Sequence, residues 1–416
     1  MEWVKYRLGE LASTIQTGPF GSQLHRSDYS MSGIPVIMPK DMINGKIDER
    51  NIARVSEEHA ERLKRHRVKC GDIIYSRRGD VGRCALVTEI QSGWLCGTGC
   101  LKVEVANNVL SSFLFYILQR QDSVGWVESH AVGSTMPNLN TDILSKLPIR
   151  LPSLNIQHRI ASILSTYDTL IENNTKRIRL LEKMAENLYK EWFVRFRFPG
   201  HEKVEMENGL PKGWKVIHIN ECCETIGGGT PSTSKIEYWN GDIKWVTPTD
   251  LTSKNSMPLL NISGRITEEG LNHSSAKLLP PYTILMTSRA SIGYLAISLE
   301  PVCTNQGFIS IVPRSQNLLL YLLYMLKNRR SEIVSNANGA TFLEISKGRF
   351  RKMKMVMPNE TLLETFQEKA FNLFNMVLKL EKQNTLLARQ RDLLLPRLMS
   401  GKLEMQDVQT VKNKNE

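Results

Sequence analysis

The stretch IASILSTYDTLIENNTKRIRLLEKMAENLYKEW, residues 160–192, decides the fold of this 416-residue chain. Apolar side chains recur in it at alternating steps of four and three residues, the heptad spacing of a helix that packs along one seam. The seam positions are Ile160, Leu164, Tyr167, Ile171, Asn174, Ile178, Leu181, Ala185, Leu188 and Trp192. The stretch contains neither Gly nor Pro, so we expect one long helix.

A second stretch with the same spacing lies 206 residues further on. Its seam positions are Phe366, Ala370, Leu373, Val377, Leu380, Asn384, Leu387, Arg391, Leu394 and Leu398. Because either seam alone would expose an apolar stripe to water, we expect the two helices to pack on each other as an antiparallel coiled coil. Asn174 and Asn384 can fix the register of such a pair, or they can simply occupy partly wet positions.

The two helices belong to an internal repeat that covers most of the chain. Further upstream the spacing between matching segments drifts by a few residues, as it does when loops differ in length. The matching segments are 133–135 with 339–341, 147–153 with 353–359, 75–83 with 286–294, and 38–41 with 247–250.

Each half of the repeat begins with about 150 residues of short apolar runs broken by Gly, Pro, Asn and Ser. Such runs are typical of short strands, and residues 111–120 and 318–329 each predict one helix among them. We therefore expect an α/β (α+β) chain with two globular domains joined by the paired helices. The predicted boundaries are 1–152 for the first domain, 153–198 for its helix, 199–213 for a linker, 214–358 for the second domain, 359–405 for its helix, and 406–416 for a disordered tail.

Composition favours a folded protein with a polyanionic partner. Hydrophobic residues make up 41% and charged residues 23% of the chain, and the formal net charge is +12. A basic excess on a folded chain favours nucleic acid, because Lys and Arg neutralise phosphates and release counterions; a merely basic soluble protein is the alternative. The N-terminus resembles no signal peptide, and the longest apolar run, 318–326, is too short to cross a bilayer, so we expect a cytoplasmic protein.

The seven cysteines point to a reducing compartment, since their number is odd and their spacing irregular. Cys70, Cys84, Cys96 and Cys100 lie near His66 in the sequence, but they lack the tight paired spacings of structural zinc sites, so we expect no metal. We also find no phosphate-binding loop, dinucleotide fingerprint, zinc-protease motif or nucleophile elbow. Asp242-Ile243-Lys244 resembles the end of a nuclease metal site only superficially. The sequence therefore favours binding over catalysis.

Candidate DNA contacts lie in loops that recur in both halves. Arginine can grip phosphate or read guanine in the major groove, and neighbouring glycines let the backbone approach a duplex. Ordinary solvated turns are the alternative for each of these loops. The candidates are Lys40, Arg77, Arg78, Arg83, Ser134, Thr135, Thr247, Arg289, Thr304, Asn305 and Thr341.

The ordered set of motifs resembles the specificity subunit of type I restriction-modification systems. The motifs are Trp3–Leu11 at the start, the loop 133–140, the P-x-x-x-Q-x-R-I segment 152–160, the run 180–196 and the close 393–404. The resemblance covers residues 1 to about 405. It implies two target-recognition domains that each read one half of a split, asymmetric double-stranded DNA sequence, with the two helices setting the gap. Phe342-Leu343-Glu344 departs from the more polar run expected there, although Glu344 could accept a hydrogen bond from cytosine.

The resemblance also implies partners. Two methyltransferase subunits would dock on the helices and methylate adenine with S-adenosylmethionine, and two restriction subunits would use ATP and Mg²⁺ to translocate and cut. No cofactor is expected on this chain. Two other hypotheses stay open: an adaptor whose domains bind protein rather than DNA, and a nuclease that acts alone.

Overall fold

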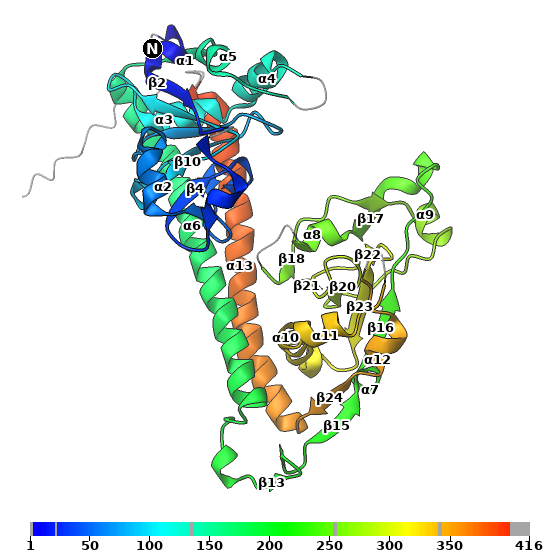
Figure 1. The fold of residues 1–416 in the computed structure, drawn as a ribbon. Helices are drawn as coiled ribbons and strands as arrows, with labels where there is room; N and C mark the ends of the chain where they lie inside the picture. Colours follow the sequence, from blue (N-terminus) through cyan, green and yellow to red (C-terminus); the bar gives the residue numbers. More distant parts are fainter. Residues whose placement is uncertain (1–2, 21–22, 134–136, 253–255, 340–342, 400–416) are drawn as a thin grey trace, which may run out of the picture. The chain divides into compact units, whose positions relative to one another are not determined.

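The computed structural model describes residues 3–20, 23–133, 137–252, 256–339 and 343–399 (Figure 1). The chain divides into two compact units. Unit 1 is Met1–Thr169 with Leu387–Glu416, and unit 2 is Leu170–Leu386. This division cuts through both long helices, whereas the sequence-based boundaries keep helices and domains apart. The predicted tail 406–416 lies outside the described residues.

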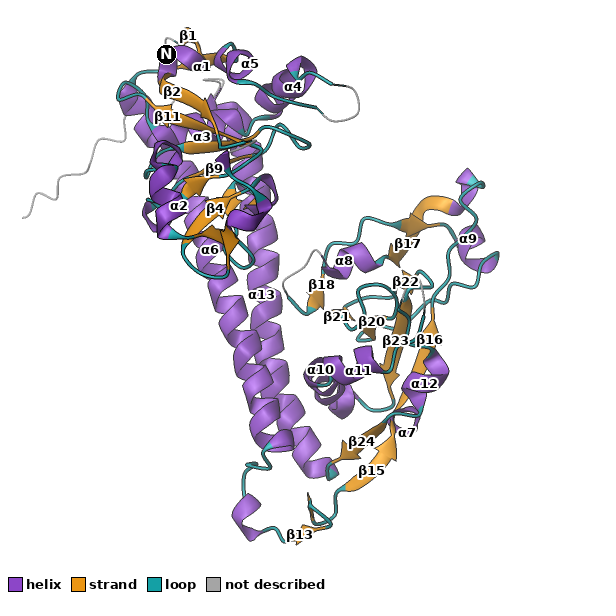
Figure 2. Cartoon of the chain, viewed as in Figure 1, coloured by secondary structure: helices purple, strands orange, loops and turns teal. Residues whose placement is uncertain are grey.

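Unit 1 carries twelve of the described strands and five short helices. Figure 2 colours strands orange and helices purple. The strands are β1 (Val4–Arg7), β2 (Ala12–Thr17), β3 (Tyr29–Ser30), β4 (Ile34–Ile37), β5 (Met42–Ile43), β6 (Lys46–Ile47), β7 (Ala53–Val55), β8 (Ile73–Ser76), β9 (Cys84–Leu86), β10 (Leu95–Cys96), β11 (Cys100–Val105) and β12 (Pro148–Leu151). The helices are α1 (Leu8–Leu11), α2 (Glu57–Arg62), α3 (Ser111–Leu118), α4 (Gln121–His130) and α5 (Thr141–Ser145).

Unit 2 repeats this inventory with small changes. Its strands are β13 (Met206–Glu207), β14 (Leu210–Pro211), β15 (Lys215–His218), β16 (Cys223–Gly227), β17 (Trp239–Val246), β18 (Pro258–Leu259), β19 (Arg265–Ile266), β20 (Ile284–Thr287), β21 (Leu295–Ser298), β22 (Cys303–Thr304), β23 (Phe308–Pro313) and β24 (Lys354–Met357). Its short helices are α7 (Ile219–Cys222), α8 (Pro248–Thr252), α9 (Glu268–Asn272), α10 (Leu319–Asn328), α11 (Arg330–Ser335) and α12 (Lys347–Arg351).

The central sheets of the two units follow one plan. The strand order is β2-β11-β8-β9 in unit 1 and β16-β23-β20-β21-β18 in unit 2, so β2 and β16 are the corresponding edge strands. Ile15 pairs with Val103 and Val103 with Ile73, just as Thr225 pairs with Ile311 and Ile311 with Ile284. Strand β1 also pairs with β12, and β15 pairs with β24, which brings the start of each globular domain to the start of its long helix.

The predicted helices 111–120 and 318–329 are confirmed as α3 and α10, each ending within two residues of the expected limit. Both are almost wholly buried in the core of their unit. The predicted linker 199–213 contains a hairpin that sequence reasoning missed. Asn208 and Gly209 form its turn with positive φ angles of 51° and 79°, the geometry that an Asn-Gly pair between two strands favours.

The two long helices are α6 (Leu154–Tyr189), which continues into a π-helical turn (Lys190–Val194), and α13 (Glu360–Met399). Every one of the twenty seam positions is buried or half-buried, and none is exposed. Among the positions proposed as helix contacts, Asn174, Ile178 and Val377 are buried, and the half-buried ones are Ile171, Leu181, Leu188, Leu380, Asn384, Leu387 and Leu394. No helix in the described ranges is both long enough and apolar enough to cross a membrane.

The helices run antiparallel within each unit. In unit 2 the Asn174 amide donates to Asn384 Oδ1 (3.0 Å), while Trp192 lies with its ring centre 6.0 Å from that of Phe366. In unit 1 Ile160 and Leu164 share a core with Leu398. The one charged seam residue, Arg391, is neutralised by Asp168 at 2.5 Å, and Asp168 also accepts from Tyr116 (2.5 Å). The seam therefore buries polar groups only where each meets a partner.

A glutamine fixes each long helix to its own domain. Gln157 of α6 is 2% exposed and accepts from the backbone amide of Leu110 (3.0 Å), just before α3. Gln367 of α13 accepts in the same way from Leu320 at the start of α10 (3.1 Å). Unit 2 adds a contact further along α6, where Glu182 accepts from the amide of Met257 (2.7 Å) and burial raises the pKa of Glu182 to about 7.

We predict that Asn174→Leu destabilises unit 2 because it leaves the half-buried Asn384 oxygen without that donor, at a cost of about 1 kcal/mol. The double variant Asn174→Leu, Asn384→Leu should recover most of the loss, since it removes both halves of the polar pair. Chemical denaturation of the two single variants, the double variant and the natural chain measures this coupling. Losses that simply add would contradict a direct Asn174–Asn384 interaction.

Candidate nucleic-acid interface

The candidate arginines of unit 1 lie in the turn after β8, and Arg77 is anchored there. Its backbone amide donates to Gly99 O (2.7 Å) and its Nε donates to Leu139 O (3.2 Å). Its guanidinium carbon lies 5.6 Å from the centre of the Phe20 ring. Arg78 is exposed, and its backbone forms a β-bridge with Asn138. The geometry suits Arg77 to positioning and Arg78 to contact.

Arg83 connects this turn to the segment that carries Lys40. Its guanidinium forms an ion pair with Asp80 (2.5 Å) and donates to Pro39 O (3.3 Å). Lys40 follows at once and is exposed. The structure therefore brings the candidates Lys40, Arg77, Arg78 and Arg83 onto neighbouring segments of one unit, although Asp80 compensates the charge of Arg83.

The same loop closure recurs in unit 2. Asn138 bridges both Arg78 and Val132 in unit 1, and Glu344 bridges both Arg289 and Asn338 in unit 2. Paired backbone hydrogen bonds of 2.9–3.0 Å close each loop, between residues 132 and 138 and between 338 and 344. The candidates Ser134, Thr135 and Thr341 belong to these loops but lie outside the described residues.

The two loops differ in charge at equivalent places. Arg289 Nε forms an ion pair with Glu344 (2.8 Å), with the side chains 47% and 41% exposed. The corresponding residue in unit 1 is the uncharged Asn138, whose buried Oδ1 meets no hydrogen-bond partner among the described residues. Arg289 therefore shares its surface with a carboxylate, whereas the unit 1 residue equivalent to Glu344 carries no charge.

The matching segments 38–41 and 247–250 share a structural role. Asp41 accepts from the amide of Met38 (2.9 Å), and Asp250 accepts from the amide of Thr247 (2.7 Å). Burial raises the pKa of Asp41. The Thr247 hydroxyl also donates to Asp250 (2.8 Å), so this candidate already has a partner within its own turn.

Thr304 and Asn305 are poorly placed for DNA. Thr304 is 1% exposed within β22, which pairs with β17, so its side chain offers no surface to a duplex. Asn305 is half-buried and its Oδ1 accepts from the amide of Gly307 (2.9 Å). These placements argue against DNA contact by Thr304 and leave Asn305 a turn-forming role.

The cysteines of unit 1 lie apart from any metal-binding arrangement. Cys84, Cys96 and Cys100 are buried, and Cys70 is exposed. His66 Nε2 accepts from Arg65 Nε (2.9 Å), and burial lowers the pKa of His66 to about 4. Among the residues that the structure describes, no group of three or more His, Cys, Asp or Glu could hold a metal ion.

Sequence reasoning missed the residues that hold the candidates in place. Phe20 near Arg77 and Asn138 bridged to Arg78 are brought there by contacts across the fold, whereas Asp80 pairs with Arg83 only three residues away. A signal existed for Asn138 only, because the repeat offset of 206 aligns it with Glu344.

Comparison with known proteins gives a consistent result. The family model described as "Type I restriction modification DNA specificity domain" matches residues 1–183 and 211–385. The HindI specificity subunit of Haemophilus influenzae is 25% identical over 97% of this chain and 100% of its own length. The MjaIX specificity subunit of Methanocaldococcus jannaschii is 26% identical over 92% of this chain and 89% of its own length.

A solved structure agrees on the fold. The S subunit of a type I restriction-modification system from M. genitalium superposes with a TM-score of 0.58. It is 18% identical and the match covers 96% of each chain. At that identity the likeness concerns the fold alone, and it supports the expected layout of two mixed domains with long helices.

We predict that Arg78→Ala weakens binding of duplex DNA and flattens its salt dependence. If Arg78 neutralises one phosphate, the slope of log affinity against log salt concentration falls by about 0.9. Fluorescence anisotropy with the full-length chain at several salt concentrations measures both quantities.

Arg150→Ala is the matched control for Arg78→Ala. Arg150 is equally cationic and exposed, but lies on β12. If the slope of log affinity against log salt concentration is equal for the two variants and the natural chain, Arg78 does not contact the DNA backbone.

Proposed function

Because this chain belongs to the type I restriction modification DNA specificity family, whose curated relatives are specificity subunits, we propose that it reads a bipartite, asymmetric DNA target and scaffolds its enzyme complex. It is a DNA-recognition subunit and not a catalytic one. In this proposal each unit reads one half of the target with its own domain. Double-stranded DNA, two methyltransferase subunits and two restriction subunits are the partners.

The repeated loop closure carries the proposal of two half-sites. Both units present an arginine bridged to a loop residue, Arg78 to Asn138 and Arg289 to Glu344. A shared framework with different side chains at equivalent points suits two readers that distinguish different bases. At the equivalent positions unit 2 has a carboxylate, which only accepts hydrogen bonds, whereas unit 1 has an uncharged amide. The expected target is therefore asymmetric.

Exposed apolar residues on the long helices support the scaffolding role. Leu170 and Leu180 of α6 are 43% and 65% exposed, and their repeat partners Met376 and Leu386 of α13 are 51% and 59% exposed. Both pairs keep the offset of 206 residues. Large apolar side chains on a surface favour contact with another protein. Their recurrence on both helices fits two copies of the same partner, as two methyltransferase subunits would require.

The cofactors of the proposed complex lie on its other subunits. S-adenosylmethionine would be bound by the methyltransferases, which methylate an adenine turned out of the duplex. ATP and Mg²⁺ would serve the restriction subunits. This chain would contribute binding and geometry: it selects the sequence and presents the adenine of each half-site to a methyltransferase.

The proposal predicts a two-part N6-methyladenine motif in host DNA that depends on this chain. Sequencing that detects modified bases, with the gene present and deleted, should show one bipartite motif with a fixed gap that disappears on deletion. Restoring the gene should restore the motif. A genome in which no methylated motif changes, while the methyltransferase is expressed and binds the chain, would contradict the proposal. Preferential binding of protein rather than duplex DNA would instead favour the adaptor hypothesis.

A further inference from the structure

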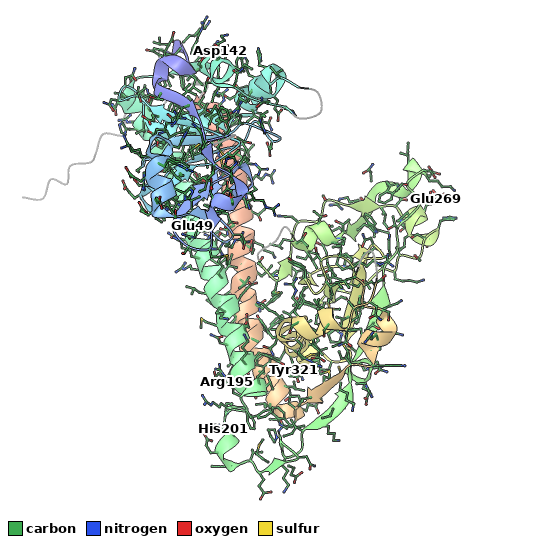
Figure 3. All side chains as sticks on the ribbon, in the orientation of Figure 1. Glu49, Asp142, Arg195, His201, Glu269 and Tyr321 are labelled. Carbon is green, nitrogen blue, oxygen red and sulfur yellow. The ribbon has the colours of Figure 1, made fainter. Side chains whose placement is uncertain are left out.

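A recess on unit 1 has a counterpart in unit 2 that the chain fills with its own arginine. The recess is shallow and open, with a volume of about 390 Å³ between α1, the edge strand β2 and α5. Ser13, Thr14, Ile15, Asp142 and Ser145 are among the residues that line it. Asp142 lies at the surface of unit 1, on α5 (Figure 3).

Strand pairing and helix caps identify the equivalent place in unit 2. Ile15 occupies the same position in the sheet of unit 1 as Thr225 does in unit 2, because each starts the corresponding row of paired strands. Helices α5 and α12 both span five residues, and each is capped by the residue before it, Asn140 or Ser346. Ser145 therefore corresponds to Arg351.

Arg351 fills that place in unit 2 with a defined geometry. Its Nε donates to the Thr225 hydroxyl (2.5 Å) and its Nη2 donates to the Thr225 carbonyl oxygen (2.7 Å). The guanidinium thus satisfies acceptors on the edge strand β16 with two hydrogen bonds in fork geometry. In unit 1 the equivalent residue, Ile15, keeps the backbone carbonyl oxygen but has no hydroxyl, and Ser145 is too short to reach this strand as Arg351 does.

The charges around this place are reversed between the units. Lys347, Gly348 and Arg351 of α12 stand where α5 has Thr141, Asp142 and Ser145. At these three positions unit 1 therefore has two fewer cations and one more carboxylate than unit 2. Asp142 pairs with Lys146 at 2.7 Å, but the two side chains are 70% and 56% exposed, so the carboxylate remains open to a second donor.

We propose that the unit 1 recess is a socket for an arginine side chain presented by a partner protein. The incoming guanidinium takes the place that Arg351 occupies in unit 2 and donates to the acceptors of β2 and to Asp142. The partner is identified by this chemistry alone: a protein surface with one projecting arginine. The inference rests on the proposed function only in taking the methyltransferase subunit as the first partner to test.

The first experiment introduces an arginine of the chain itself into the socket. Ser145→Arg places the chain's own arginine at the position of Arg351, and we expect the affinity for the methyltransferase subunit to fall on the order of tenfold or more. Ser32→Arg adds the same charge at an exposed loop position of unit 1 and should leave that affinity unchanged. A melting temperature equal to or above that of the natural chain verifies that each variant folds. Methyltransferase binding by Ser145→Arg at the natural affinity would overturn the socket for this partner.

A small probe tests the socket independently of the methyltransferase. Acetyl-arginine-amide, titrated into full-length chain with labelled threonine, should give saturable NMR shifts at Thr14 and Thr141. The neutral isostere acetyl-citrulline-amide should not, and Ser145→Arg should abolish the response. If the methyltransferase fails to bind the natural chain, the proposed function fails and this titration still decides the socket. Identical responses to both probes, or no saturable response, would refute it.

Discussion

The pairing of α6 with α13 is the constraint on which the rest of the structure depends. In unit 1 the domain core includes Ile160 and Leu164 from one helix and Leu398 from the other. In unit 2 the core includes Trp192 and Phe366 in the same way. Neither domain completes its core without both helices, and each buried side chain of this size contributes about 1.5–3 kcal/mol. The helix pair is therefore part of both hydrophobic cores rather than a spacer attached to finished domains.

Duplication explains which features the units share and which they do not. Shared features are those that the backbone needs: the aspartate caps at Asp41 and Asp250, and the glutamines Gln157 and Gln367 that fix each helix to its domain. Differences gather where a ligand can reach. Asn138 corresponds to Glu344 in the repeat, and Ser145 corresponds to Arg351. A framework held by buried hydrogen bonds can vary its exposed residues at little cost in stability, and that freedom suits a protein family that must read many DNA sequences.

The sequence predicted the long helices well because a seam is a local pattern with a regular period. All twenty seam positions are buried or half-buried, including Arg391, whose partner Asp168 could not be read from spacing. The fold class and the helices α3 and α10 were also predictable. The site was less predictable from the sequence. Thr304, for example, is a polar residue of a type common on surfaces, yet its side chain is buried. Ion pairs such as Arg289–Glu344 join residues 55 positions apart, and only the fold brings them together. Such contacts depend on how the loops close, and no periodic pattern in the sequence predicts that.

The most direct test of two equivalent readers is a chain that carries the first domain twice. Residues 3–152 would replace residues 214–358, a substitution that joins matching ends because Trp3 corresponds to Trp214 and Pro152 to Pro358. Modified-base sequencing of cells that express this chain with the methyltransferase would then report its target. The account predicts a methylated motif in which the half-site of the first domain occurs twice. A chain that folds and binds the methyltransferase, yet still methylates the original asymmetric motif, would contradict it.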